Sequence, residues 1–425
     1  MRREGNIFSN IDWVTLMIYF MLVIFGWLNI YAVEYNSEEV VGIFSMELNS
    51  GKQLFFMGVA LIAGVAIFII DYNFYNRFAF GFYILIIVLL LGVTFIGPTI
   101  SGAKSWIRIG PFGLQPSEFI KFAAALSVAK FISDRNVRLD RIDRDFFIVC
   151  ALIAIPAGLI VLQGDAGTAL VFGSFVFVLY REGLTPWVLI LGLVGFLLFV
   201  LTLAIGPIYM YVGLGLLTLL GLGLLSRMKL ARMFAIIGIA IVCSGIVFSV
   251  DTFVNDILKP HQSMRIKVLF NPDLDPRGAG YNVNQSKIAI GSGGMWGQGF
   301  LEGSQTKLSY VPEQHTDFIF CTIGEEHGWA GSFLLIVLFM GLLFRVIFIS
   351  ERQKNSFVRI YGYSVACILF FHFMINIGMT IGLFPVIGIP LPFFSYGGSS
   401  LLSFTILLFI LLKLDSHRKL SLNRF

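Results

Sequence analysis

The chain has 425 residues, of which 57% are hydrophobic and 13% are charged, and its formal net charge at pH 7 is +5. Soluble domains carry about 25% charged residues, so this composition excludes an ordinary soluble enzyme and predicts an integral membrane protein. Continuous apolar runs of helical length exclude an outer-membrane barrel, whose strands are short and alternating. We attribute the positive charge to membrane topology rather than to nucleic-acid binding. The four cysteines show no spacing typical of zinc or redox sites.

The hydrophobic runs predict an all-α polytopic membrane protein with about twelve transmembrane helices. The N-terminus is polar and the first apolar run already has full span length, so no cleavable signal peptide is expected. The run at 168–181 is short for a bilayer, which needs about 20 residues, so that span is expected to be tilted or partly interfacial. The predicted spans are 12–33, 52–71, 78–97, 116–132, 146–162, 168–181, 186–204, 208–225, 231–250, 328–348, 358–383 and 397–413.

Positive residues are distributed unevenly between the two sides of these spans. Of the 30 Lys and Arg residues, 19 fall on the side of the two termini and nine on the other. Cytoplasmic loops are enriched in Lys and Arg, so both termini are predicted to be cytoplasmic. ATP is absent outside, and the chain has no P-loop. A synthetic reaction on the outer face must therefore use a substrate that carries its own leaving group. The outward loops are 34–51, 98–115, 163–167, 251–327 and 384–396.

The longest outward loop, 251–327, is the predicted catalytic region, because polar loops between spans are where a polytopic protein places its chemistry. Proline and glycine surround Asp275 in NPDLDPRGAGY and predict a turn. A carboxylate there can act as a general base, but Asp before Pro more often stabilises its own turn. Asp273 is a rival two residues away. The residues alone do not decide whether Asp275 is a base or a turn-stabilising residue, or whether Asp273 takes the role of base instead.

The end of the same loop reads VPEQHTDFIF, in which Glu313, His315 and Asp317 alternate. This spacing is a weak metal-site pattern, because alternate residues of an extended segment need not converge. His-x-Asp also occurs in hydrolase relays, but no nucleophile elbow accompanies it here.

The loop before the fourth predicted span carries two cations, Lys104 and Arg108, with the interfacial aromatic Trp106 between them. Glu118 and Lys121, at the start of the span, are three residues apart and therefore share one helix face. Such a pair either faces a functional cavity or forms a structural ion pair. The sequence favours neither alternative.

Two further outward turns are candidates. In QGDAGT, we favour Asp165 as an N-cap of the segment that begins at Thr168, over a site role. At 384–400, FPVIGIPLPFFSYGGSS predicts irregular backbone at the entry to the last span, which a membrane tolerates only when it is buried or lines a cavity. A plain connecting loop is the alternative. Asn376, in the preceding span, needs a polar partner.

Taken together, these motifs resemble the SEDS family of peptidoglycan polymerases, whose two main branches are RodA and FtsW. The resemblance covers most of the chain from about residue 100 onward, in the family's order, and the AIGSGG run looks more like RodA than FtsW. It rests on GAKSWIRIG, LQPSEFIK, QGDAGTALV, NPDLDPRGAGYNVNQSKIAIGSGG, VPEQHTDFIF, EEHGWAG and GIPLPFFSYGGSS.

This sequence departs from the family pattern at several positions. Gly164 and Ala166 stand where the family usually has Pro and Leu. Ser105 stands where many members have Arg, which puts a phosphate-binding role of that position in doubt; Lys104 or Arg108 can substitute. Family members usually have ten spans. The resemblance therefore implies one membrane domain over 1–425, a catalytic loop at 251–327 and an extra helix pair inserted within 186–250.

The resemblance implies that the substrate is lipid II and that the reaction is inverting glycosyl transfer, with undecaprenyl diphosphate as the leaving group. Asp275 matches the family's loop aspartate and is expected to be the general base. Leaving-group charge needs cations, so a divalent ion, magnesium or manganese, is the expected cofactor, and no organic cofactor is expected. The residues expected to bind substrate are Lys104, Trp106, Arg108, Glu118, Lys121, Asp165, Gln285, Ser286, His315, Asp317 and Ser395.

The resemblance also implies a class B penicillin-binding protein and other elongation-complex proteins as partners, in cell elongation. The alternatives are an FtsW-type division polymerase, a lipid II flippase and a non-catalytic scaffold. Polar residues cluster on the predicted outer side rather than along a path across the bilayer. That clustering favours chemistry at the outer surface over transport.

Overall fold

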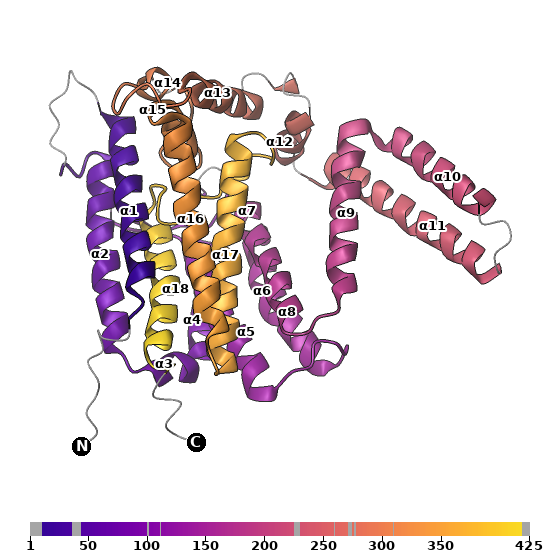
Figure 1. The fold of residues 1–425 in the computed structure, drawn as a ribbon, viewed down its shortest axis with the longest axis horizontal. Helices are drawn as coiled ribbons and strands as arrows, with labels where there is room; N and C mark the ends of the chain where they lie inside the picture. Colours follow the sequence, from indigo (N-terminus) through magenta and orange to yellow (C-terminus); the bar gives the residue numbers. More distant parts are fainter. Residues whose placement is uncertain are drawn as a thin grey trace. The chain divides into compact units, whose positions relative to one another are not determined.

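The computed structural model describes residues 11–35, 44–99, 102–110, 112–224, 230–258, 260–270, 274–275, 278–308 and 310–418. Over these residues the protein is helical apart from one antiparallel two-stranded hairpin (Figure 1). The predicted all-α class is therefore confirmed. The chain divides into two compact units. Unit 1 contains 1–183, 285–381 and 387–425, and unit 2 contains 184–284 and 382–386.

Each of the twelve predicted spans is helical in the structure. Ten described helices are long and apolar enough to cross a membrane. The other two predicted spans are α5 (Pro116–Arg135), which contains the Glu118–Lys121 pair, and the short stretch Ala166–Arg181. That stretch is divided into α7 (Ala166–Val171), the turn η2 (Phe172–Ser174) and α8 (Phe175–Arg181).

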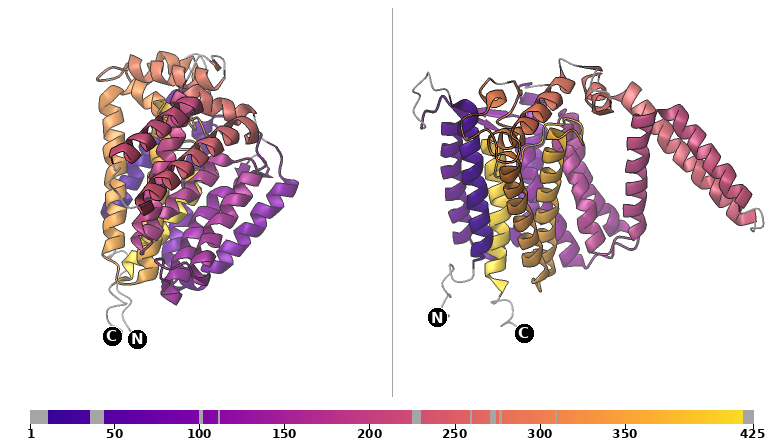
Figure 2. Two further views of the ribbon diagram at one scale, coloured as in Figure 1. Left: turned by 90° about the vertical axis from the view of Figure 1, so that its right-hand side faces the viewer. Right: turned by 45° about the horizontal axis from the view of Figure 1, so that its top comes forward.

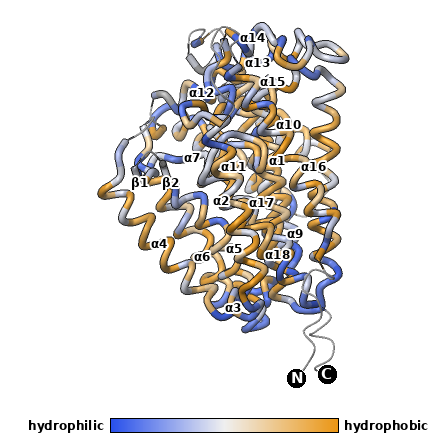
Figure 3. The backbone as a smooth tube through the Cα atoms, turned by 90° about the vertical axis from the view of Figure 1, so that its left-hand side faces the viewer, coloured by the Kyte–Doolittle hydropathy of each residue, from blue (hydrophilic) through white to orange (hydrophobic). Residues whose placement is uncertain are grey.

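Unit 1 is a bundle of long helices. Figure 2 shows them side by side from two further directions, and Figure 3 shows that they are apolar along most of their length and more polar toward their ends. Besides α5, α7 and α8, the helices of unit 1 are α1 (Trp13–Glu34), α2 (Asn49–Ile69), α3 (Tyr72–Arg77), α4 (Ala79–Ile96), α6 (Arg144–Leu162), α14 (Ser304–Lys307), α15 (Ile319–Glu326), α16 (Gly328–Glu351), α17 (Ser356–Thr380) and α18 (Gly398–Ser416).

Helix α5 is the centre of unit 1. It begins at Pro116, whose fixed φ suits the first helical position, and ends at Asn136, a left-handed C-cap with φ 49°. It packs against α4, α6, α17 and α18. The run of small residues at 123–125 is fully buried and allows this close packing. Polar side chains on α5 are therefore enclosed by protein and need protein partners.

At the end of unit 1 where α1 begins and α18 ends (Figure 1), charged side chains join three helices. Asp12, the N-cap of α1, accepts hydrogen bonds from Arg345 of α16 at 3.0 and 2.6 Å. Arg352 bridges Asp12, at 3.2 Å, to Asp415 of α18. Burial raises the pKa of Asp12, but the bonds from Arg345 and Thr15 outweigh burial and lower that pKa to about 2.

At the opposite end of unit 1, short helices form where the sequence indicated only a polar loop. Glu325, at the end of α15, is fully buried. It accepts hydrogen bonds from the Gln305 and Thr306 amides, at 2.7 and 2.9 Å, at the start of α14. A carboxylate at a helix N-terminus satisfies amides that lack intrahelical partners. This contact holds the start of α14 against the end of α15.

Unit 2 contains three long apolar helices, α9 (Pro186–Ile205), α10 (Pro207–Leu224) and α11 (Leu230–Thr252). They pack on one another around Leu198, Met210 and Val247. Most of their other apolar side chains are exposed, as expected of helices in contact with lipid. The assignment of two of them to an inserted pair within 186–250 stays a prediction.

The remaining elements of unit 2 lie in the predicted catalytic loop. Helix α11 continues into the π-helical turn η3 (Phe253–Ile257), and α12 (Pro260–Phe270) follows. Helix α13 (Ala279–Ser292) contains the boundary between the two units.

Candidate functional site

The centre of unit 1 holds the predicted ion pair. Lys121 Nζ lies 2.8 Å from Glu118 Oε2, and each residue is only 2% exposed. The three-residue spacing on α5 places both side chains on one face, so the predicted pairing is confirmed. Removing two charges from water is costly unless further hydrogen bonds satisfy them. The surroundings of the pair therefore decide what it can do.

Those surroundings come from α17 and α18. His372 Nε2 of α17 lies 3.0 Å from Lys121 Nζ, and the Phe404 ring of α18 lies 4.5 Å from the same ammonium. Ser403 donates to Glu118 Oε2 at 3.5 Å, a weak contact. The sequence interpretation missed His372 and Ser403. A signal for His372 existed, because an ionisable residue inside an apolar span is by default a candidate for function.

Asp165 lies in a second polar cluster of unit 1. It is the N-cap of α7 and accepts from the Thr168 amide at 3.0 Å and the Thr168 hydroxyl at 2.8 Å, so the predicted capping role is confirmed. Gln115, directly before α5, donates to Asp165 Oδ2 at 3.0 Å. The backbone N–H of Gln115 donates to the Ser399 hydroxyl of α18 at 3.1 Å. Three segments distant in sequence thus meet beside the start of α5.

The predicted cations of the preceding loop lie on its surface. A hairpin of β1 (Ile107–Ile109) and β2 (Phe112–Leu114) leads into Gln115. Lys104 and Arg108 are exposed, and neither side chain has a hydrogen bond or ion pair with a described residue. The Trp106 ring packs on Gly113, where a Cβ would come within 2.8 Å of it. Both cations are therefore free to meet an anionic ligand.

The irregular backbone between α17 and α18 is buried, as the sequence predicted. Ser395 donates to the Thr316 carbonyl at 2.6 Å. Asn376 finds the partner it needed, because it donates to the Asp317 carbonyl at 2.9 Å and to the Ile389 carbonyl at 2.7 Å. The segment after α14 therefore packs on the loop 384–396. Ser395 and Asn376 serve first to hold this backbone.

The other residues expected to bind substrate occupy separate positions in unit 1. Ser286 is buried and donates to the Thr380 carbonyl at 2.9 Å. Gln285 is half-buried. The half-buried His315 ring lies against the Tyr396 ring, with 5.7 Å between the centroids. Among the described residues, none of these side chains forms a hydrogen bond or ion pair with Glu118 or Lys121.

A divalent cation is held by several oxygen or imidazole ligands that converge on one point. Over the described parts of the chain, no group of three His, Cys, Asp or Glu side chains is arranged to hold a metal ion. Glu313, His315 and Asp317 do not form such a group. Glu118 has an ammonium at 2.8 Å, and this positive neighbour does not suit a second cation. The described residues therefore do not form a site for a divalent cation.

In unit 2, Asp275 lies in a turn close to the start of α13, as predicted. Its half-buried carboxylate rests against Gly278, where any Cβ would overlap the Asp275 Oδ2 atom. A larger residue at this position would therefore displace the Asp275 carboxylate. Nearby in sequence, Arg265 of α12 donates to the Val386 carbonyl at 3.3 Å. Asp273, the rival general base, lies outside the described residues.

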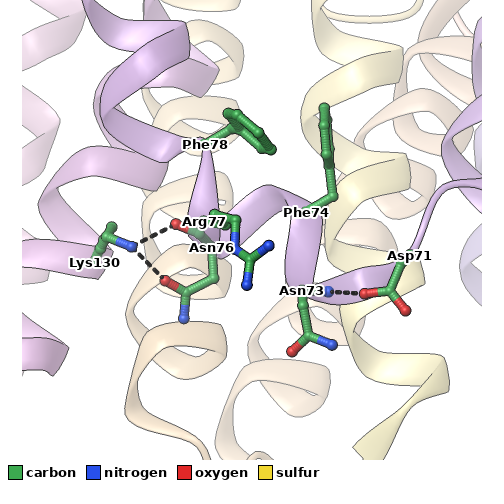
Figure 4. Close-up of a pocket in the computed structure, with 7 residues that line it drawn as sticks. All are labelled: Asp71, Asn73, Phe74, Asn76, Arg77, Phe78 and Lys130. Carbon is green, nitrogen blue, oxygen red and sulfur yellow. Dashed lines mark hydrogen bonds between the residues drawn. The ribbon is translucent and has the colours of Figure 1, made fainter.

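One surface pocket lies apart from all of these groups. Its volume is about 650 Å³. It forms around α3, where Lys130 donates to the Asn76 carbonyl and side chain at 2.7 and 3.0 Å (Figure 4). It contains none of the predicted site residues. The pocket is lined by Asp71, Asn73, Phe74, Asn76, Arg77, Phe78 and Lys130.

The fold and these polar clusters define a multi-pass helical membrane protein whose central helix carries a buried ion pair. Residues 12–420 match the profile of the FtsW, RodA and SpoVE family, described as cell cycle proteins. The chain belongs to this family, the SEDS family, and is RodA-like. It is a multi-pass protein of the bacterial cytoplasmic membrane.

Similarity to known proteins extends along nearly the whole chain. It is 32% identical over 412 residues to the peptidoglycan glycosyltransferase MrdB of Escherichia coli K12, covering 97% of this chain and 95% of that protein. It is 31% identical over 434 residues to the peptidoglycan glycosyltransferase RodA of Treponema pallidum, covering 96% and 98%. A solved chain from a peptidoglycan synthase complex that coordinates polymerization and crosslinking shares the fold, with a TM-score of 0.66, 24% identity and coverage of 96% and 98%.

Proposed function

We propose that this chain is a peptidoglycan glycosyltransferase that polymerises lipid II during cell elongation. The observation that carries the proposal is the buried Glu118–Lys121 pair beside the Gln115–Asp165 contact, in a chain similar over nearly its full length to peptidoglycan glycosyltransferases. A buried cation in the first turns of α5, which follows a loop with two exposed cations, suits a diphosphate-linked substrate.

In the proposed reaction, Asp275 takes the proton of the GlcNAc 4-hydroxyl of the acceptor. The oxygen attacks C1 of the donor MurNAc from the face opposite the diphosphate. As the new C–O bond forms, the bond from C1 to the diphosphate oxygen breaks and the electron pair leaves with undecaprenyl diphosphate. The anomeric centre inverts, and the product has a β-1,4 bond.

The departing diphosphate gains negative charge, so the rate depends on cations placed to meet it. Lys104 and Arg108 are exposed and suit the first contact with the anionic headgroup. Lys121 is fixed in position by its buried partners and suits the charge that develops in the transition state. Fixed donors are more effective there than mobile ones, because they need no reorganisation during the reaction.

The excess of Lys and Arg on the side of the termini supports a cytoplasmic location for both ends. The polar clusters near the start of α5 then face outward, where lipid II is presented after transfer across the membrane. We further propose that a class B penicillin-binding protein and other elongation proteins are its partners. A solved chain of the same fold belongs to a synthase complex that couples polymerization to crosslinking, which supports such a partnership.

The test is polymerisation of labelled lipid II by the detergent-purified protein, with its class B partner and a divalent cation supplied. Wild type is compared with Asp275→Asn, which keeps the size and turn-forming ability of the side chain but cannot act as a base. Asp251→Asn is the matched control, because Asp251 lies at the end of α11, where the predicted loop begins, and among the described residues its carboxylate accepts one local bond, from Asn255 at 2.8 Å.

Glycan strands from wild type and the control, and none from folded Asp275→Asn, would support the proposal. Strands from Asp275→Asn would remove this residue as the base and direct attention to Asp273. If wild type makes no strands, lipid II transport across vesicles is the next measurement, because it tests the flippase alternative directly.

A further inference from the structure

Both ring nitrogens of His372 are engaged within unit 1. Nε2 lies 3.0 Å from Lys121 Nζ, and Nδ1 lies 3.2 Å from the Pro390 carbonyl oxygen. His372 is 1% exposed, so water does not compete for either contact. The side chain thus connects Lys121 of α5 to the irregular segment between α17 and α18.

The partners assign the proton on the ring. A carbonyl oxygen only accepts, so Nδ1 must carry the hydrogen that points at Pro390. In the neutral imidazole, Nε2 then has a free lone pair and accepts from the Lys121 ammonium, which only donates. A second proton on the ring would place two cations 3.0 Å apart. The arrangement therefore requires a neutral His372 beside a charged Lys121.

Three neighbours fix the Lys121 ammonium. Glu118 Oε2 lies at 2.8 Å, His372 Nε2 at 3.0 Å, and the centroid of the Phe404 ring at 4.5 Å. The His372 ring also packs edge-on against Phe404, with 4.8 Å between centroids and 85° between planes. One turn further along α17, Asn376 donates to the Ile389 carbonyl at 2.7 Å. The orientation of the imidazole ring is thus set by its contacts with Lys121, Pro390 and Phe404.

We propose that His372 is a positioning residue that orients Lys121 toward the diphosphate of the bound substrate. The inference rests on the proposed function. Glu118 is a charged acceptor and holds the ammonium more strongly, whereas the neutral imidazole is the weaker partner. A diphosphate oxygen is also a charged acceptor. The Lys121 ammonium has three N–H donors, of which Glu118 and His372 take two, so the third can meet this oxygen while both partners hold the side chain in place.

Two substitutions separate the hydrogen bonds of His372 from its packing. His372→Gln can still donate to the Pro390 carbonyl and accept from Lys121. His372→Phe keeps a planar ring against Phe404 but removes both nitrogens. The control is Ser364→Ala, on the same helix, because the buried Ser364 hydroxyl donates only to the Ile360 carbonyl of its own helix.

Polymerisation of labelled lipid II is measured for each variant with the partner present, and kcat and KM are determined separately. We expect His372→Phe to lower kcat by roughly 10- to 100-fold, because a small misplacement of a transition-state group has effects of that order. We expect KM to change little, and His372→Gln to stay within about threefold of wild type. Wild-type kcat in His372→Phe, or equal losses in both variants, would overturn the proposal.

A second measurement needs no substrate. Thermal unfolding is compared for His372→Phe, Lys121→Met and the double variant in the purified protein. If the two side chains interact, the fall in Tm of the double variant is smaller than the sum of the single falls. Additive falls would overturn the inference. An inactive wild type would count against the proposed function, while this cycle would still test the contact.

Discussion

The Gln115 side chain donates a hydrogen bond to Asp165 Oδ2 over 3.0 Å, across 50 positions of sequence. It joins the residue that precedes α5 to the N-cap of α7. Asp165 therefore has two tasks, because the Thr168 amide bonds to one carboxylate oxygen while Gln115 and the Thr168 hydroxyl bond to the other.

Substitution of Asp165 can separate capping from charge. Asparagine is as good an N-cap as aspartate, whereas alanine at such a position costs about 1 kcal/mol. We expect Asp165→Asn to unfold near the wild-type Tm and Asp165→Ala about 1 °C lower, because 1 kcal/mol is a small part of the unfolding free energy change with temperature in a chain of this size. If the carboxylate charge supports Lys121, both variants lose polymerisation to a similar extent. Thermal unfolding checks the effect on capping, and lipid II polymerisation checks the effect of the charge. Full activity in Asp165→Asn would limit Asp165 to a structural role.

The contacts that sequence predicted are local. The Glu118–Lys121 pair follows from helical spacing, and the Asp165 cap follows from the preference of Asp for the position before a helix. The spans were also predictable, because each depends on the hydropathy of its own window. The contact of Lys121 with His372 joins residues 251 positions apart. It depends on how α5, α17 and α18 pack, which no local pattern determines.

The predicted loop 251–327 shows the same limit. The turn at Asp275 was predictable from its prolines and glycines, but helices α12 to α15 were not. Helix α14 has only four residues and depends on Glu325, which is distant in sequence and caps its amides. Isolated helices this short are not stable. Such elements exist only in the folded protein, so a hydropathy pattern does not reveal them.

Gly278 is expected to be essential for the position of Asp275. Because a Cβ at residue 278 would overlap the Asp275 carboxylate, Gly278→Ala should displace that group and reduce polymerisation by about 100-fold. Gly291→Ala is the control, because Gly291 lies on α13 with no heavy atom within 4 Å of an added Cβ. Alanine there should be neutral or slightly stabilising. Equal activity in the two variants would contradict the assignment of Asp275.

Glu326 should make the stability of the protein depend on pH near neutrality. It is 1% exposed, and neither carboxylate oxygen has a hydrogen-bond partner of good geometry among the described residues. Burial raises its pKa from 4.5 to about 7. The folded state thus binds a proton that the unfolded state releases, so stability falls as pH rises from 4.5 to about 7 and is constant above that range.

Glu326→Gln should remove this dependence, because glutamine does not titrate. We expect it to be more stable than wild type at pH 8, by roughly 2 to 3 kcal/mol at most, and similar at pH 5. The control is Glu302→Gln, an exposed carboxylate of the same loop, which should keep the wild-type profile. Tm measured at intervals from pH 5 to 8 checks the expectation. A parallel wild-type and Glu326→Gln profile would show that Glu326 is not the group responsible.

Asp12 should behave in the opposite way at the other end of unit 1. Its pKa is lowered from 3.8 to about 2, because hydrogen bonds from Arg345 and Thr15 exceed the effect of burial. Its contribution to stability is therefore fully present above pH 3.8 and is lost as pH falls toward 2. Asp12→Asn keeps the N-cap of α1 but removes the charge that Arg345 and Arg352 share. We expect this substitution to lower the free energy of unfolding at pH 7 by about 1 to 3 kcal/mol, because Arg345 is partly exposed and water screens the pair. The difference in stability from wild type should shrink as the pH approaches 2. Unfolding of both proteins at pH 7, 4 and 2.5 measures this, and a difference that stays constant over that range would assign the loss to packing rather than to charge.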